Sequence, residues 1–320
     1  MDGPLVSIIV ATYNQERYVE QSLTSALAQD YDNAEVIVAD DASRDATPEI
    51  IRRMAIEWGP RLVPIFGQEN LGPTGNSNRG LLRRRGKYVC FLAGDDLYQP
   101  GKIARQVQWM EADDARVACG HDVEAFDDDS GARLYQTSEQ RPLGEGTGAA
   151  AMLEDGGLFP GLSLMVRSDA IPPYGYDERV GLLSDWKLQL DCLVNGGAYG
   201  YVDAVFARYR VHKDALHQRS LREEAVHQEY VDGYLKGLAL IESAHPELRK
   251  SCARGRGLIL FSEARYQIGR GRKRAAREFY RAATRERPSL WWKAAAGISL
   301  TVLPEMVMNR LERVVLRRSG

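Results

Sequence analysis

The first 120 residues alternate short, strongly apolar runs with amphipathic stretches, and this alternation constrains the fold more than any other feature. The apolar runs are rich in β-branched residues, which favours strands, and the stretches between them have helical length. The runs are almost continuously apolar, as expected of parallel strands buried on both faces. Strands alternating with helices predict βαβ units and a mostly parallel sheet. The predicted strands are residues 5–13, 34–40, 61–67, 87–93 and 115–122, and the predicted helices are 15–29, 46–58, 74–85 and 100–111.

Polar residues cluster where these predicted strands end. In open α/β sheets, ligands bind beyond the carboxyl ends of the strands. The second strand ends at Asp40-Asp41, and Asp95-Asp96 follows the fourth. Adjacent carboxylates repel each other, and a buried charge needs a partner. A turn explains a single Asp, whereas the pair after the fourth strand requires hydrogen bonds, a cation, or both.

Several segments together carry a resemblance to a known family. They are "PLVSIIVATYN", "VIVADDAS", "ENLGPTGNSNRGL", "KYVCFLAGDDLYQPGKI", "ERVGLLSDWKLQL" and "YRVH", in this order and spacing. The chain resembles the family 2 inverting glycosyltransferases of the GT-A fold over roughly residues 4–215. We therefore expect a GT-A α/β domain over 1–215, followed by a C-terminal helical extension over 216–320.

The resemblance implies a nucleotide-sugar site, with a UDP-linked sugar as the expected donor. By this resemblance, Tyr13 packs on the base, Asp41 bonds a uracil-type imide and Asp95 binds the ribose. For Asp41 and its neighbours, capping of the following helix is the structural alternative.

The resemblance also implies a metal ion and a catalytic base. Asp96 corresponds to a ligand of a divalent cation, Mn²⁺ or Mg²⁺, on the diphosphate, and His212 to a histidine that in some relatives approaches the metal or diphosphate. Asp185 corresponds to the general base that deprotonates an acceptor hydroxyl. A diphosphate leaving group needs a divalent cation, and these cations prefer oxygen ligands. The structural alternatives are a first-turn helix acid for Asp185 and an exposed strand-end histidine for His212.

Two positions depart from the usual family pattern and leave other functions open. Ala93 stands where many relatives have a further Asp, and Ser184 replaces the commoner Glu before the base. A catalytically silent sugar-nucleotide-binding protein is therefore an alternative. A nucleotidyltransferase is another, although the first strand lacks the Gly-rich, basic phosphate loop typical of that class. We expect transfer to a hydroxyl of a glycan or lipid-linked acceptor, in cell-surface polysaccharide or glycoconjugate synthesis.

The charge of the chain is divided unevenly along its length. Residues 1–245 carry 24 Lys and Arg against 38 Asp and Glu, whereas residues 246–320 carry 18 against 6. In the tail, apolar Val307, Leu311 and Val314 recur with helical spacing, as in interfacial helices. The tail therefore predicts contact with an anionic membrane surface, and docking on the acidic catalytic domain is the alternative. We expect no nucleic acid partner.

Two observations concern the compartment. The four cysteines lie far apart without a paired spacing, which is typical of core thiols in a reducing compartment. The N-terminus has no basic segment or cleavage pattern of a secretory signal, and the longest apolar stretch, residues 294–304, is shorter than the ~20 residues of a spanning helix. We expect a cytoplasmic protein, with peripheral attachment to the inner face of the membrane as the open alternative.

Overall fold

The computed structural model of the chain describes residues 3–140, 144–155, 159–213, 215, 219–220 and 222–300. The chain divides into two compact units, Met1–Gly233 and Tyr234–Gly320. The domain boundary near residue 215 stays a prediction.

The N-terminal half of the first unit consists of the predicted βαβ units. Strands β1 (Val6–Thr12), β2 (Ala34–Asp40), β3 (Leu62–Phe66) and β4 (Tyr88–Ala93) are parallel neighbours in the order β3-β2-β1-β4. The helices between and after them are α1 (Val19–Leu27), α2 (Thr47–Trp58), α3 (Gly72–Leu81) and α4 (Lys102–Glu111). Each element overlaps its predicted range, because the hydrophobic period identifies strands and helices of this length directly.

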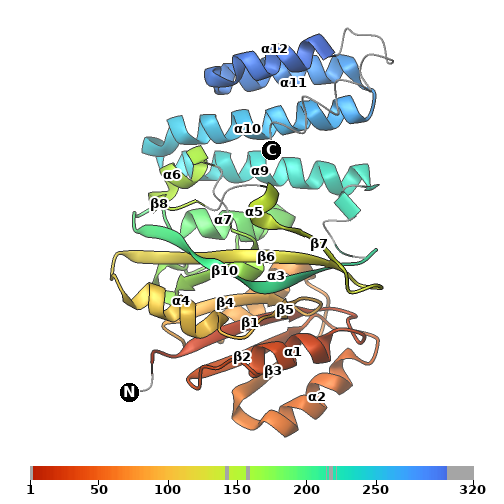
Figure 1. Cartoon of the computed structure of the whole chain (residues 1–320), viewed down its shortest axis with the longest axis vertical. Coiled ribbons are helices and arrows are strands. Elements are labelled where there is room, and N and C mark those ends of the chain that lie inside the picture. The colour runs from red at the N-terminus through yellow and green to blue at the C-terminus, as the bar shows by residue number, and fades with distance from the viewer. Residues whose placement is uncertain are drawn as a thin grey trace. The chain divides into compact units, whose positions relative to one another are not determined.

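The remaining strands extend this sheet with mixed directions. Strand β9 (Met165–Arg167) lies antiparallel between β4 and β6 (Arg116–Asp127), and β10 (Ala198–Val211) runs parallel to β6. The described residues thus form a sheet of ten strands, and the predicted α/β fold class is confirmed, with parallel pairing in β3-β2-β1-β4 and β6-β10 (Figure 1). Short strands pair antiparallel at its margins: β5 (Leu97–Tyr98), β7 (Arg133–Gln136) and β8 (Gly146–Thr147).

Short helices complete the first unit. The α-helices are α5 (Thr137–Gln140), α6 (Gly148–Asp155) and α7 (Ser184–Asp191). The 3-10 turns are η1 (Gly59–Arg61), η2 (Gly161–Ser163), η3 (Ser168–Ala170) and η4 (Glu178–Leu183).

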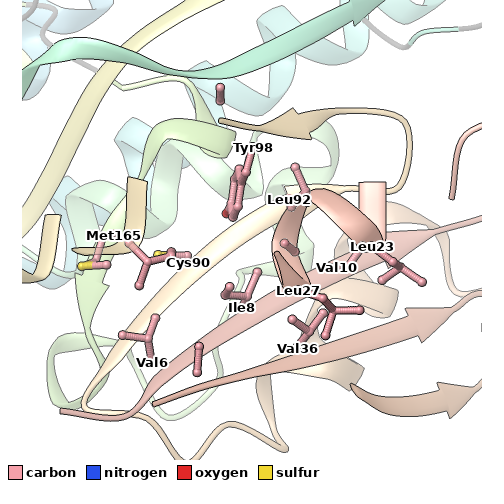
Figure 2. Packing of buried hydrophobic residues seen from close by; sticks show 14 of the residues in the cluster. Val6, Ile8, Val10, Leu23, Leu27, Val36, Cys90, Leu92, Tyr98 and Met165 are labelled. Carbon is pink, nitrogen blue, oxygen red and sulfur yellow. The ribbon is translucent and has the colours of Figure 1, made fainter. Parts of the chain in front are cut away.

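The main hydrophobic core lies around β1. Leu23 and Leu27, four residues apart on one face of α1, are buried against the sheet. Replacing either by Ala would cost about 2–5 kcal/mol, because a fully packed site leaves a cavity. Figure 2 shows this core with side chains from β1, α1, β2 and β4: Val6, Ile8, Val10, Leu23, Leu27, Val36, Cys90 and Leu92.

The second unit is helical in its described residues, as predicted. Helix α9 (Glu224–Ala244) enters it, and α10 (Arg249–Gly269), α11 (Lys273–Glu286) and α12 (Trp291–Leu300) follow, with turns η5 (Pro246–Leu248) and η6 (Pro288–Leu290). Helices α10, α11 and α12 pack in sequence order (Figure 1). Tyr280 is the centre of their core, and Gly297 lies so close to its ring that a Cβ would clash. No helix among the described residues has the length and apolar character to cross a bilayer.

Candidate active site

Apart from Asp185, the predicted site residues lie at or just after the ends of strands whose carboxyl ends are at one edge of the sheet. Strands β1, β2 and β4 are parallel. Strand β9 is antiparallel to both β4 and β6, so β6 runs in the same direction as β4. Strand β10 is parallel to β6, so it points the same way as β4. His212, after β10, therefore reaches the same edge as Asp95, after β4, although 117 residues separate them.

At the end of β2, Asp41 is held by the start of α3. Its side chain is almost fully buried and accepts the backbone N–H groups of Leu71, at 2.9 Å, and Gly72, at 2.8 Å. The Arg79 guanidinium donates to the same carboxylate at 3.2 Å. Asp41 thus satisfies donors that the first turn of α3 would otherwise leave free. A bond from Asp41 to an imide stays a prediction, and it would use a remaining lone pair.

The loops after β1 and β2 are tied to each other. The Asn14 backbone N–H donates to Ser43 Oγ at 2.8 Å, and the Arg44 backbone N–H donates to Asn14 Oδ1 at 2.9 Å. Asp40, in turn, accepts hydrogen bonds from the backbone and hydroxyl of Ser43. Beside Asn14, Tyr13 is 43% exposed, so its ring is free to stack on a planar ligand. The predicted stacking on a base is compatible with this exposure and stays a prediction.

At the end of β4, the two adjacent carboxylates have different partners. Asp96 is buried, and its carboxylate accepts the Arg210 backbone N–H at 2.9 Å, the only hydrogen bond to that carboxylate among the described residues. Burial, and then the charge of Asp95, raises the pKa of Asp96 well above its usual value. Asp95 Oδ2 lies 3.0 Å from Nε2 of His212, and Asp95 Oδ1 has no partner within the described part of the chain.

The pairing of Asp95 with His212 fits a divalent cation. Two ligands at about 2.1 Å from an octahedral ion and at right angles to each other are about 3.0 Å apart, and Asp95 Oδ2 and His212 Nε2 have that separation. The residues that the structure describes contain no group of three or more His, Cys, Asp or Glu side chains suited to a metal ion. An ion here would therefore need a substrate phosphate and water to complete its coordination. In the structure His212 lies beside Asp95, whereas the Asp96 carboxylate accepts a hydrogen bond from the backbone of β10.

Asp185 lies in the first turn of α7. Its side chain is open to solvent, yet the surrounding protein removes enough water to raise the pKa of its carboxyl. Oδ1 accepts the N–H of Trp186 at 2.7 Å, whereas Oδ2 has no hydrogen bond among the described residues. Leu183, rather than Asp185, occupies the N-cap. This placement agrees with a first-turn acid and also leaves one oxygen available to accept a proton.

Of the two unusual positions in the motifs, Ser184 has a structural role, whereas nothing in the structure explains Ala93. Ser184 Oγ lies 2.9 Å from Thr74 Oγ1, which also donates to the Gly181 carbonyl, so the Ser184 hydroxyl links α7 to α3. Gly94, next to Ala93, packs so tightly that a Cβ would come within 2.3 Å of Gln15 Oε1. A side chain at position 94 would therefore displace the loop after β1.

Two residues of the site, Arg210 and Asp128, were not predicted from the sequence. Arg210 lies within the "YRVH" segment, two residues before His212 and thus on the same face of the strand. Asp128 follows β6, and its side chain accepts from Arg210 at 2.9 Å and from the Tyr18 hydroxyl at 2.8 Å. The spacing within "YRVH" was the available signal for Arg210, whereas no local pattern distinguishes Asp128 in an acidic loop.

Comparisons with known proteins identify the family of the chain. The family model described as Glycosyl transferase family 2 matches residues 7–171. An uncharacterized glycosyltransferase of Rickettsia typhi is 30% identical over 240 residues, which is 74% of this chain and 73% of the relative. An uncharacterized glycosyltransferase of Haemophilus influenzae is 31% identical over 193 residues, covering 60% of this chain and 73% of the relative.

Solved structures with a similar fold include TarS and a mannosyltransferase. Residues 1–349 of TarS from S. aureus align with a TM-score of 0.63 at 17% identity, over 92% of this chain and 88% of that one. The mannosyltransferase PcManGT from Pyrobaculum calidifontis, in complex with GDP-Man and Mn²⁺, aligns with a TM-score of 0.58 at 21% identity, over 93% and 86%. At these identities, the likeness establishes the fold.

Proposed function

Because the chain belongs to glycosyl transferase family 2, we propose that it transfers a sugar, with inversion, from a nucleotide-diphosphate sugar to a hydroxyl of a glycan or lipid-linked acceptor. The observation that carries the proposal is the convergence of Asp95 and His212, from strands far apart in sequence, at the carboxyl edge of the sheet. The pathway in this proposal is cell-surface polysaccharide or glycoconjugate synthesis.

A UDP-linked sugar is the proposed donor. TarS has been solved with UDP and with UDP-GlcNAc, and PcManGT with GDP-Man, which supports a nucleotide-sugar partner for this fold. In this chain Tyr13 would stack on the base, Asp41 would accept from the imide, and Asp95 would face the ribose or the metal. The exposed ring of Tyr13 supports the first of these roles.

A divalent cation, Mn²⁺ or Mg²⁺, is the proposed cofactor. When bound, it would neutralise the charge that develops on the departing diphosphate. The family resemblance assigns its ligands to Asp96 and, as in some relatives, His212. The 3.0 Å separation of Asp95 Oδ2 and His212 Nε2 favours Asp95 and His212, because Asp96 is directed to the Arg210 backbone.

Asp185 is the proposed general base. The acceptor oxygen would attack the anomeric carbon, the bond from that carbon to the diphosphate oxygen would break, and the acceptor proton would pass to the Asp185 carboxylate. The nucleoside diphosphate leaves with the electron pair. The raised pKa of Asp185 makes it a stronger base than an ordinary Asp, and its free Oδ2 supports this role.

The test measures release of nucleoside diphosphate from a panel of UDP- and GDP-sugars with Mn²⁺, with and without candidate acceptors. Asp185→Asn should lower transfer by about 10²–10⁴-fold and leave donor affinity nearly unchanged, because the base acts on the acceptor. The amide can still accept the Trp186 N–H, so the fold should persist. Asp169→Asn, at an exposed first-turn position of η3, is the matched control.

Three outcomes separate the alternatives. Binding of a sugar nucleotide without turnover under any condition would indicate a silent binding protein. Release of pyrophosphate from a nucleoside triphosphate would indicate a nucleotidyltransferase. Near-normal transfer by a folded Asp185→Asn variant would exclude Asp185 as the base.

We also propose that the C-terminal region binds an anionic membrane surface from the cytoplasmic side. The tail helix predicted over 307–317 lies outside the described residues. Within them, Trp291 and Trp292 are 68% and 56% exposed at the start of α12. Exposed Arg281 and Arg285 lie on the preceding helix. Indoles favour the interface between lipid and water, and arginines favour anionic headgroups, which supports the proposal.

Co-sedimentation tests this membrane proposal. Vesicles containing phosphatidylserine should bind the protein at low salt, and pure phosphatidylcholine vesicles should bind it much less. Replacing both tryptophans by Ser should weaken binding several-fold, whereas Ile56→Ser, at another highly exposed apolar side chain, should not. Absence of binding to anionic vesicles at low salt would contradict the proposal.

A further inference from the structure

Arg210 donates hydrogen bonds from its backbone N–H and from all three guanidinium nitrogens at the end of β4. Its backbone N–H donates to Asp96 Oδ1 at 2.9 Å, and its Nε donates to the Asp95 carbonyl at 2.7 Å. Nη1 donates to Asp128 Oδ1 at 2.9 Å, and Nη2 donates to Gln21 Oε1 at 2.8 Å. The side chain is 7% exposed. One buried residue therefore holds the backbone of Asp95 and the carboxylate of Asp96 without occupying the carboxylate of Asp95.

The same group of contacts reaches His212 from the other side. Asp128 accepts from Arg210 and also from the Tyr18 hydroxyl. The Tyr18 ring lies 5.1 Å from the His212 ring, and the Arg210 guanidinium lies 4.9 Å from the Tyr18 ring. These contacts connect Arg210, Asp128, Tyr18, His212 and Asp95 in a closed circle. We call these five residues the Arg210 cluster.

The Arg210 cluster fixes the positions of the Asp95 and His212 side chains, which a metal ion would need as ligands. A bidentate or forked guanidinium restricts its partners more than an ammonium does, because its donors are held in one plane. Within the cluster, Arg210 donates to the Asp95 carbonyl, and the Tyr18 ring packs against the His212 ring. Asp95 Oδ2 and His212 Nε2 thereby face each other at hydrogen-bonding distance, 3.0 Å.

We propose that Arg210 is a positioning residue that sets the distance between the Asp95 carboxylate and the His212 imidazole, and that Asp128 is its buried counter-charge. This inference rests on the proposed function, because it concerns the residues that would hold the metal-bound diphosphate. In this role Arg210 contacts neither the nucleotide-sugar donor nor the sugar acceptor. It acts through the backbone of Asp95, while Asp128 acts through Tyr18.

The rival explanation is an ordinary structural ion pair. Removing one partner of a buried pair leaves an unpaired charge and destabilises the fold. A structural pair would therefore lower stability but leave nucleotide and metal affinity unchanged in the protein that remains folded. A positioning pair changes the affinity for the metal-bound diphosphate even where the fold is intact. Binding, rather than stability or activity alone, distinguishes the two.

The experiment measures binding of UDP and of GDP by calorimetry in the full chain, across a Mn²⁺ titration. Arg210→Lys keeps the charge and loses the fork, so we expect at least a tenfold loss in the Mn²⁺-dependent part of the affinity and little change without Mn²⁺. Arg208→Lys is the matched control, because Arg208 lies on the same strand and face and pairs with Glu124 at 2.9 Å. It should bind as the wild type does.

A second variant protects the test against loss of the fold. Asp128→Asn keeps an acceptor near Arg210 and removes the charge, and we expect a smaller loss in the same direction. If Arg210→Lys does not fold, the Mn²⁺-dependent nucleotide affinity of Asp128→Asn tests the proposal instead. Wild-type Mn²⁺ dependence in whichever of these variants is folded would overturn the positioning role and leave the proposed function standing. If the wild type itself binds neither nucleotide with Mn²⁺, the proposed function and this inference both fail.

Discussion

The carboxyl ends of β2 and β4 both carry two adjacent aspartates, but the protein treats the two pairs differently. At β2, Asp41 accepts two backbone N–H groups and a guanidinium, and Asp40 accepts twice from Ser43. At β4, Asp96 accepts one backbone N–H, and Asp95 faces His212.

The difference indicates which pair is built into the fold and which is prepared for a ligand. Buried carboxylates are normally satisfied by several donors. The β2 pair follows this rule, so Asp40 stabilises the loop after β2 and Asp41 stabilises the start of α3. The Asp96 carboxylate has a single donor, and burial together with the charge of Asp95 raises its pKa. A cation would supply what is missing at β4, whereas at β2 nothing is missing.

The largest effect expected from this comparison is on donor binding at the β4 end. Asp95→Asn should abolish most Mn²⁺-dependent binding of the donor and reduce turnover by two orders of magnitude or more, on the order of the loss seen for other groups that stabilise developing charge. Asp96→Asn should retain more of both, because its amide oxygen can still accept the Arg210 N–H. Calorimetry with UDP and Mn²⁺ measures this difference. The reverse order of effects would return the metal ligand to Asp96, as the sequence predicts.

A smaller effect, on stability, is expected at the β2 end. Asp41→Asn places an amide N–H₂ against the N–H of Leu71 or Gly72, so one buried donor loses its acceptor. The free energy of unfolding should fall by about 1–3 kcal/mol, as measured by urea denaturation. Asp95→Asn serves as the comparison and should change stability by much less. Equal destabilisation by both variants would remove the distinction between the two pairs.

The smallest effect expected is a pH dependence of stability at Asp96. A carboxyl whose pKa is raised by folding contributes stability below its unfolded pKa, near 3.8, and loses that contribution as pH rises through the folded value. Asp96→Asn removes this loss. Relative to the wild type, the variant should therefore become more stable as pH increases from about 4 towards neutrality. Thermal unfolding in metal-free buffer across this range measures the trend, and a flat difference would contradict it.

The sequence predicted the N-terminal elements and the edge of the sheet at which a site should lie. The strand over 34–40 coincides with β2, and the helix over 46–58 differs from α2 by one residue. Such agreement is possible because these elements depend on local hydrophobic period and turn residues. The antiparallel pairing of the three-residue β9 with β4 and β6 could not be predicted, since it depends on residues distant in sequence.

What the sequence by itself determined is the order of strands and helices, the family, and the set of polar residues that follow the strands, because each depends on nearby residues along the chain. Only the tertiary structure decided which of those residues meet. It joined His212 to Asp95, directed Asp96 to the backbone of β10, and brought in Arg210 and Asp128. These contacts depend on the directions of strands separated by more than a hundred residues, and side-chain chemistry at one position carries no information about that direction.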